Sequence, residues 1–293
     1  MNVRRSCTTA IMRKFGLKLF LDTVQRLRVT DLLIAPPVAL MLTKSDLTSQ
    51  YDLSSVERLL CGAAPLQPEM SKKLEAIFNG KVHARQGWGM TEATMAVTLF
   101  TPDECDASHR GVGYLVPNME LRIVKDDGQV AGYREEGEAQ IRGPNVFKGY
   151  YKNLEASQDI CSEGGWLKTG DIVTMQESGL LTIVDRKKEL IKVKGFQVSP
   201  SEIEGVLLEH EHVKDCAVVR VIREGQEHPQ AYIVASDKKV TTESIMAFLD
   251  ARLSVYKRLT GGVVFVDAIP KSPSGKILRR MLHRSASKEL AHL

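Results

Sequence analysis

Apolar residues near the start of the chain recur at a helical spacing. Over residues 15–27 they return every three to four positions, which predicts a helix. Phe15, Leu19, Val24 and Leu27 fall on one broad face of this helix. Because an amphipathic helix buries its apolar face, we expect these four side chains to pack against a core.

Short apolar runs then alternate with an amphipathic stretch. Residues 32–35 form an apolar run that ends at Pro36-Pro37, and residues 56–60 form another, as buried strands do. Residues 68–78 have helical periodicity and are followed by Asn79-Gly80, a signal for the end of a helix. Strands that alternate with helices in this way predict a parallel α/β sheet.

Farther along the chain the apolar runs become shorter, and turn residues separate them. Residues 121–124, 138–142 and 181–184 have the length and composition of strands. Turns such as Asp126-Asp127-Gly128 and Ser178-Gly179 lie between or beside them. This pattern predicts a small antiparallel barrel or a distorted sheet.

A third pattern begins near Lys188. The run Ser199-Pro200-Ser201-Glu202 has the form of a capping box with proline at the first helical position, so a helix is expected to start there. Further strands are expected at residues 216–221, 231–235 and 263–266, and a second helix is expected at residues 244–253.

These patterns divide the chain into two predicted domains. The first, residues 1–187, combines the parallel α/β part (about 1–100) with the β-rich part (111–185). The second, residues 188–293, is a small α+β domain with apolar faces of its own. A chain of 293 residues is long enough to form both.

Composition and charge narrow the class of protein. The chain is 43% hydrophobic and 26% charged, which excludes a disordered or collagen-like chain. Its 40 basic and 36 acidic residues give a net charge of +4, too small and too dispersed to indicate nucleic-acid binding. No apolar run approaches the roughly 18–20 residues that a membrane-spanning helix needs. The five cysteines are scattered without a CxxC pair, which argues against structural zinc and for a reducing compartment.

Three short segments carry residues suited to phosphate and sugar chemistry. Residues 87–92 (GWGMTE) form a glycine-containing loop with a hydroxyl and a carboxylate, a combination that suits a phosphate group. Residues 169–171 (TGD) place a carboxylate after a turn, where it would accept hydrogen bonds from a ribose. Residues 271–276 (KSPSGK) hold a lysine in a loop shaped by proline and glycine. Taken singly, each is more often an ordinary turn, a cap or a solvated basic loop.

Five segments in a fixed order change that interpretation. They are GWGMTE at 87–92, GEAQIRGPNVFKGYY at 137–151, GWLKTGD at 165–171, DRKKELIKVKGFQVSPSEIE at 185–204 and PKSPSGKILRR at 270–280. Together they closely resemble the adenylate-forming superfamily, which includes acyl- and aryl-CoA synthetases, 4-coumarate:CoA ligases and beetle luciferases. The resemblance implies that residues 1–187 are the C-terminal part of a large AMP-binding domain and that residues 188–293 are the small mobile domain that follows it.

The resemblance also implies a two-step reaction. A carboxylic acid attacks the α-phosphate of ATP to give an acyl-adenylate and pyrophosphate, and coenzyme A then displaces AMP to form a thioester. Such catalysis depends on positioning and on charge stabilisation at phosphorus. The implied cofactors are ATP, Mg²⁺ and coenzyme A, and the implied partner is a small-molecule carboxylic acid.

Matching the family motifs residue by residue gives roles at the phosphates and the ribose. Thr91 matches a threonine that contacts phosphate, and Glu92 matches a glutamate associated with Mg²⁺. Asp171 and Arg186 match the residues on the ribose hydroxyls. Lys276 matches the lysine that bridges the carboxylate and the α-phosphate during adenylation. The adenine and acyl pocket would be bordered by residues of two segments, namely Gly62, Ala63, Ala64, Gln86, Gly87 and Trp88, the last of which would stack on adenine.

The second half-reaction would use residues that follow the β-rich part. Lys188 falls at the hinge between the domains, about which the small domain would swing. Lys192 matches a lysine implicated in thioester formation. Lys194 and Gly195 lie in the loop that would approach coenzyme A, and Gln197 lies beside them.

One family motif has no counterpart in the first sixty residues. Relatives carry a Ser/Thr/Gly-rich loop ending in lysine, whose backbone amides bind the β- and γ-phosphates. We therefore expect the sequence to be a fragment, the product of an incorrectly assigned start, a truncated paralogue or a chain that acts with another.

Two functions stay open at this stage. One is an acyl- or aryl-CoA ligase of the coumarate-ligase and luciferase-like branch, which includes ligases of secondary metabolism. The other is a catalytically inactive remnant that serves as a binding or interaction module. An in-frame phosphate-loop sequence upstream of Met1 would favour the enzyme.

Three smaller features complete the expectations. Ala291-His292-Leu293 at the C-terminus resembles the peroxisomal targeting signal S-K-L. This resemblance predicts that the protein binds the peroxisomal import receptor and lies in the peroxisome; without such a signal it would be cytoplasmic. Cys61 precedes residues 62–66 (GAAPL), which also resemble the adenylate-forming superfamily, and Cys61 itself matches no family role. We therefore expect a buried core cysteine in preference to a nucleophile. Arg279-Arg280 is expected to lie on a solvated helix face.

Overall fold

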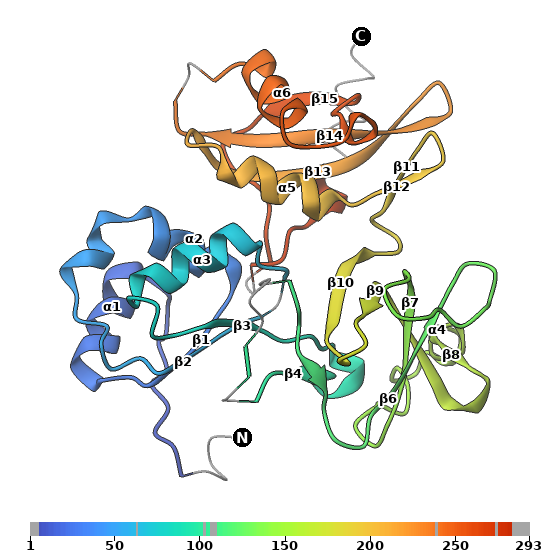
Figure 1. Ribbon diagram of the computed structural model, residues 1–293, viewed down its shortest axis with the longest axis horizontal. Coiled ribbons are helices and arrows are strands. Elements are labelled where there is room, and N and C mark those ends of the chain that lie inside the picture. The colour runs from blue at the N-terminus through green and yellow to red at the C-terminus, as the bar shows by residue number, and fades with distance from the viewer. Residues whose placement is uncertain are drawn as a thin grey trace. The chain divides into compact units, whose positions relative to one another are not determined.

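The computed structural model of the chain describes residues 6–62, 64–101, 104–105, 110–237, 240–272 and 275–282 (Figure 1). The chain divides into two compact units, of which the first holds residues 1–87 and 100–110 and the second holds residues 88–99 and 111–293. The predicted domain boundary at Lys188 therefore falls inside the second unit, and it stays a prediction.

The first unit contains the parallel α/β sheet that the sequence predicts. Its three strands pair in parallel in the order β1-β2-β3, namely β1 (Asp31–Ile34), β2 (Arg58–Cys61) and β3 (Ala84–Gln86). Helices α1 (Leu17–Leu27), α2 (Pro36–Lys44) and α3 (Pro68–Ile77) and the 3-10 helix η2 (Asp46–Gln50) connect and cover these strands. Residues of all three helices and three strands share one apolar core.

One expectation about this unit is wrong in detail, and another is correct but incomplete. The buried face of α1 holds Leu21 and Val24, whereas Leu19 and Leu27 are about half exposed, at 51% and 50%. The buried stripe runs through positions 17, 20, 21 and 24, which also repeat every three to four residues, so the spacing alone allowed two faces. Pro36-Pro37 end β1 as expected but also begin α2, because the first turn of a helix has no use for the missing N–H.

The second unit begins with an antiparallel sheet, which confirms the change of pattern in the sequence. Its strands pair in the order β10-β9-β7-β6, with the short β8 beside β9. The strands are β6 (Glu120–Val124), β7 (Gly137–Arg142), β8 (Cys161–Ser162), β9 (Trp166–Met175) and β10 (Leu181–Arg186). Helix α4 (Leu154–Ile160) and the strand pair β4 (Thr98–Leu99) and β5 (Tyr114–Leu115) complete this part.

The remaining residues of the second unit form a sheet with helices on it. Strands β13 (Val213–Arg223) and β14 (Gln226–Ala235) form a long hairpin, and β15 (Gly262–Phe265) adds to β14 in parallel. Helices α5 (Pro200–Glu209) and α6 (Thr242–Asp250) pack on one face, and the hairpin of β11 (Ile191–Val193) and β12 (Phe196–Val198) precedes them. The opposite face is covered by Ile269 and Leu282.

Both faces of this sheet are therefore buried, and the apolar clusters on them draw only on residues 191–282. The cluster of the antiparallel sheet draws only on residues 88–183. Among the described residues, no helix is long and apolar enough to cross a membrane.

Candidate active site

Asp171 lies at the centre of the predicted ribose site, and it joins three segments of the second unit. It lies on β9 directly opposite Arg186 on β10. The indole N–H of Trp88 donates to one carboxylate oxygen of Asp171 at 2.8 Å. Arg186 Nε is 3.3 Å from the other oxygen. The structure thus brings together three residues that the sequence assigned to nucleotide binding.

The environment of Asp171 sets its charge state. Only 7% of its side chain is exposed. Burial raises the pKa of Asp171, because the ionised form loses water, and this effect exceeds the lowering of the pKa by Trp88, Arg186 and Lys276. Lys276 therefore lies close enough for its charge to act on Asp171. A buried carboxylate with cations beside it is suited to accept hydrogen bonds from a sugar diol.

The GWGMTE loop has a shape that its residues dictate. A Cβ on Gly89 would overlap the carbonyl oxygen of Met95, so the chain can take this path only with glycine. The loop then forms a short 3-10 helix, η3 (Thr91–Ala93), with the Thr91 side chain exposed. Thr91 is therefore accessible from solvent.

A second segment holds this loop in place. The hydroxyl of Tyr150 donates to the carboxylate of Glu92 at 2.6 Å. This bond raises the pKa of Tyr150 to about 12. The side-chain amide of Asn145 donates to two carbonyls of the loop, those of Ala93 and Ala96, at 2.9 and 3.0 Å. The segment of residues 145–150 is part of a family motif, but no pattern in the sequence connects it to Glu92.

The predicted adenine segments of the first unit also contact one another. The side chain of Gln86 makes two hydrogen bonds to the main chain of Leu66, at 2.7 and 3.0 Å. The N–H of Gly62 donates to the carbonyl of Ile34 at 3.1 Å. These bonds hold the loop that carries Gly62 and Ala64 against the strand that ends in Gln86. Gly87 follows that strand directly, and Ala63 lies outside the described residues.

Cys61 is a core residue, as expected. It is 1% exposed at the end of β2. Burial raises the pKa of its thiol to about 12, so almost none of it is thiolate at neutral pH. This environment is the opposite of the one that activates a cysteine nucleophile.

The predicted hinge residue Lys188 is exposed and follows a clasp that the sequence did not reveal. One carboxylate oxygen of Asp185 accepts hydrogen bonds from the hydroxyls of Ser199 and Ser201 at 2.5 and 2.6 Å, and from the N–H of Ser201 at 3.2 Å. Its other oxygen accepts from the N–H of Arg186 at 2.7 Å. Asp185 therefore ties the end of β10 to the start of α5. The sequence signal that could have indicated this contact is the aspartate directly after the predicted strand of residues 181–184.

The residues assigned to the second half-reaction lie on one hairpin. Lys194 and Gly195 form the turn between β11 and β12 with positive φ at both positions, 47° and 86°, as in a two-residue hairpin turn. Lys192 is exposed on β11, and Gln197 Nε2 on β12 donates to Asp126 at 3.4 Å. The charge of Lys192 also contributes to the lowered pKa of Asp126, behind the larger effect of Lys187.

Lys276 lies in a narrow loop that its own backbone closes. The N–H of Lys276 donates to the hydroxyl of Ser272 at 3.1 Å, and the carbonyl of Lys276 accepts from the N–H of Ser272 at 2.8 Å. The Lys276 side chain is exposed. The structure thus sets Lys276 near Asp171 and Lys192 near Asp126, two different carboxylates of the second unit.

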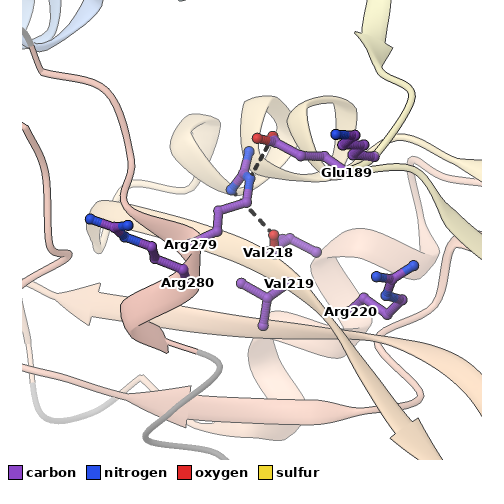
Figure 2. Close-up of a pocket in the computed structure, with 7 residues that line it drawn as sticks. Glu189, Val218, Val219, Arg220, Arg279 and Arg280 are labelled. Carbon is purple, nitrogen blue, oxygen red and sulfur yellow. Dashed lines mark hydrogen bonds and ion pairs between the residues drawn. The ribbon is translucent and has the colours of Figure 1, made fainter. Parts of the chain in front are cut away.

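The expectation for Arg279 is wrong, whereas Arg280 is exposed as expected. Only 14% of the Arg279 side chain is exposed, because its guanidinium pairs with Glu204 and with Glu189. Figure 2 shows the pairing with Glu189. The two arginines lie on different sides of the same short helical turn, so Arg279 is mostly buried and Arg280 is exposed. The sequence pattern does not distinguish them.

The chain resembles proteins of one family along most of its length. Residues 2–151 match the AMP-binding enzyme family, and residues 202–276 match the AMP-binding enzyme C-terminal domain. The chain is 42% identical over 296 residues to 4-coumarate–CoA ligase 1 of Petroselinum crispum, a match that covers 98% of this chain and 54% of that protein. It is 40% identical over 287 residues to acyl-CoA synthetase ACTT5 of Alternaria alternata, which covers 95% of this chain and 49% of that protein.

Solved structures show the same likeness. The anthranilate CoA ligase AuaEII in complex with anthranoyl-AMP matches with a TM-score of 0.86 and 26% identity, over 98% of this chain and 55% of that one. The o-succinylbenzoate coenzyme A synthetase of Bacillus subtilis in complex with AMP matches with a TM-score of 0.81 and 27% identity, over 96% of this chain and 56% of that one.

The chain spans about half the length of the curated relatives it matches. Within that span, the order of the motifs, the parallel and antiparallel sheets and both family matches agree with one another. The segment from Trp88 to Lys276 supplies the grouped aspartate, arginine and lysine that the motifs predict. On these grounds the chain belongs to the AMP-binding enzyme family of adenylate-forming enzymes.

Proposed function

We propose that the chain forms the ribose-binding and thioester-forming part of an ATP-dependent acyl- or aryl-CoA ligase. The observation that carries this proposal is Asp171, a buried carboxylate bound by Trp88 and Arg186 within the field of Lys276. In the reaction, a carboxylic acid would attack the α-phosphate of ATP and release pyrophosphate. The sulfur of coenzyme A would then attack the acyl carbon and release AMP. Aryl and medium-chain acids, including those of secondary metabolism, are the proposed substrate class.

The residues of the second unit divide the first step among them. Asp171 and Arg186 would hold the ribose hydroxyls, and Thr91 would donate to a phosphate oxygen. The Lys276 ammonium would bridge the α-phosphate and the incoming carboxylate, where negative charge gathers in the transition state. In the first unit, Gly62, Ala64 and Gln86 would border adenine and the acyl group.

The residues around Glu92 fit a Mg²⁺ ion that would be held by phosphate oxygens as well as by protein oxygens. Magnesium prefers oxygen ligands and keeps several waters, and Glu92 offers a carboxylate beside the exposed hydroxyl of Thr91. Among the described residues, no group of three or more metal-ligating side chains could hold an ion by itself. When bound, the ion would neutralise charge on the phosphates, and Tyr150 would keep the Glu92 carboxylate aimed at it.

The second step would use the hairpin of Lys192, Lys194 and Gly195 for coenzyme A, after rotation about Lys188. If the two lysines serve different steps, Lys276→Ala would stop adenylation and spare thioester formation from a supplied acyl-adenylate, and Lys192→Ala would do the reverse. Removal of a positioned charge costs on the order of 3 kcal/mol of transition-state stabilisation. Equal loss of both steps in both variants would argue against alternation.

The direct test is AMP binding by the 293-residue chain, measured by calorimetry. Asp171→Ala should abolish binding, and Asp159→Ala, an exposed aspartate of the same unit, should not. Because no Ser/Thr/Gly-rich phosphate loop occurs in these 293 residues, we expect ATP–pyrophosphate exchange only after fusion to the phosphate-loop segment of a relative. Wild-type protein that binds no AMP, with or without this segment, would contradict the proposal.

That same missing motif favours a second candidate function, a catalytically inactive binding module. A module of this kind would bind AMP or an acyl-adenylate without turnover. It predicts binding that depends on Asp171, combined with no exchange activity even in the fused protein.

We also propose delivery to the peroxisome through Ala291-His292-Leu293, which lie outside the described residues. The support is the likeness of this tripeptide to S-K-L, with a basic residue before a final leucine. A fluorescent protein fused to the N-terminus should give puncta that coincide with a peroxisomal marker and disperse when Leu293 is deleted. A diffuse cytoplasmic signal from the intact fusion would contradict the proposal.

A further inference from the structure

A buried cluster of charges centres on Arg279, three residues beyond Lys276, and Figure 2 shows Arg279 with Glu189 and the carbonyl of Val218. The guanidinium of Arg279 pairs with Glu204 through both terminal nitrogens and with Glu189 at 2.8 Å. Arg279 also donates to the carbonyl of Val218 on β13 at 3.2 Å. Only 14% of the Arg279 side chain and 10% of the Glu204 side chain are exposed. Three separate segments therefore meet at one side chain.

Such a cluster tolerates little change in geometry. Burial raises the pKa of Glu204 even with Arg279 beside it, so the ionised carboxylate depends on its partners. The N–H of Val218 donates to the same carboxylate at 2.7 Å. A buried ion pair that loses one partner leaves an uncompensated charge, which is strongly unfavourable. Arg279 is therefore held in one position relative to α5 and β13.

The other end of the loop is held in the same way. Lys271 Nζ lies 2.6 Å from the carboxylate of Asp215, which is also on β13. Lys271 forms a β-bridge with Ile277, and the N–H of Leu278 donates to the carbonyl of Pro270 at 2.8 Å. Both ends of the loop are thus joined to each other and fixed to one strand, and Lys276 projects from between them.

We propose that Arg279 is a positioning residue for Lys276. It fixes the C-terminal end of the loop, three residues beyond the lysine, and Lys271 fixes the other end. Since Glu189 follows the hinge residue Lys188, Arg279 also joins the loop to the hinge segment, so that Lys276 and α5 move as one body. This inference rests on the proposed function for the role of Lys276 at the phosphate and for Lys188 as the hinge.

The first test measures AMP binding to the whole chain by calorimetry. Lys276→Ala should weaken binding about tenfold or more, as loss of a charged hydrogen bond does. Arg279→Gln should weaken it by a similar factor, and the double variant should bind no more weakly than Lys276→Ala alone, because Arg279 acts through the lysine. Arg280→Gln, the exposed neighbour, is the matched control and should bind within about twofold of wild type.

The second test needs no ligand. Hydrogen exchange should speed up at the amides of Lys276 and Leu278 in Arg279→Gln, while the β13–β14 amides stay as protected as in Arg280→Gln. Arg279→Lys should restore part of this protection, since lysine keeps the charge but cannot pair with two carboxylates at once. If Arg279→Gln does not fold, Glu189→Gln removes the more exposed partner and should give a smaller loss of protection at the same amides.

The outcomes separate the inference from the proposed function. If Lys276→Ala leaves AMP binding unchanged, the role of Lys276 at the phosphate is wrong, and the exchange data still decide whether Arg279 orders the loop. If Lys276→Ala weakens binding but Arg279→Gln does not, the inference is overturned. Additive losses in the double variant, or faster exchange throughout the hairpin, would also overturn it, since both indicate a general loss of stability.

Discussion

At the residue scale, the role proposed for Asp171 in ribose binding comes with a cost to the stability of the fold. Its raised pKa means that the ionised carboxylate is less favourable in the folded chain than in the unfolded chain. The penalty is present in full above the folded-state pKa, and it fades as the pH falls from there to the ordinary value. We therefore predict that Asp171→Asn raises the Tm near neutral pH while it weakens AMP binding.

The check is thermal unfolding of both proteins between pH 3 and pH 7, where 1 kcal/mol corresponds to about 2–4 °C. The gain in Tm should shrink as the pH is lowered. A gain that is equal at all pH values would show that ionisation of Asp171 is not its cause.

Tyr150 offers a second prediction at this scale. Its pKa of about 12 arises first from the hydrogen bond to Glu92, then from burial and from repulsion by the same carboxylate. Glu92→Gln removes the carboxylate charge, so the pKa of Tyr150 should fall toward 10. Absorbance at 295 nm during a pH titration measures this change, and subtraction of the Tyr150→Phe titration isolates the signal of this tyrosine.

Tyr151→Phe, which removes the neighbouring exposed tyrosine, is the control and should leave the difference between wild type and Glu92→Gln intact. An unchanged titration of Tyr150 in Glu92→Gln would disprove the contact.

The site was predictable from sequence only where motifs carried it. Trp88 and Asp171 are 83 positions apart, so no local pattern could show that the indole N–H bonds to the carboxylate. The resemblance assigned both to the nucleotide, and the structure brings them together. Arg279 had no such motif role, and its burial depends on Glu204 and Glu189, which lie 75 and 90 positions away.

At the scale of elements, helices with a clear start were the easiest to predict. Helices α3 and α5 both begin with proline, and Ser199 caps α5 through the N–H of Glu202. Strand β9 was not predicted, because Lys168, Thr169 and Gly170 interrupt its apolar residues in the middle. Its pairing with β7 and β10 on either side supplies what the local pattern lacks.

The clasp between Asp185 and the start of α5 leads to a prediction about the hinge. Asp185→Asn leaves one acceptor oxygen in place of two, so the side chain can no longer accept both from the serine hydroxyls and from the N–H of Arg186. Residues 186–188 should then open more often, and trypsin should cleave after Arg186, Lys187 or Lys188 several-fold faster. Timed proteolysis followed by mass spectrometry locates the cuts.

Asp127→Asn, an exposed turn residue of the same unit, is the control. Equal cleavage rates in wild type and Asp185→Asn would mean that the clasp does not restrain the hinge.

At the scale of the whole molecule, the apolar clusters predict where the chain can be divided. Those of the C-terminal sheet draw only on residues 191–282, and both faces of that sheet are covered from within this range. A fragment of residues 188–293 should therefore be soluble and should unfold cooperatively on its own. Circular dichroism on heating, with size-exclusion chromatography, tests this prediction, and a fragment that aggregates or melts without a transition would contradict it.

The path of the backbone at Gly89 affects how mutagenesis of the GWGMTE loop should be interpreted. Any side chain there would collide with the Met95 carbonyl, so Gly89→Ala would displace Thr91 and Glu92 although the substitution itself removes no side chain that could contact a nucleotide. In an alanine scan this position would score as highly as a ligand-binding one. Only a scan that also records the melting temperature of each variant can tell a steric requirement from a chemical one in this loop.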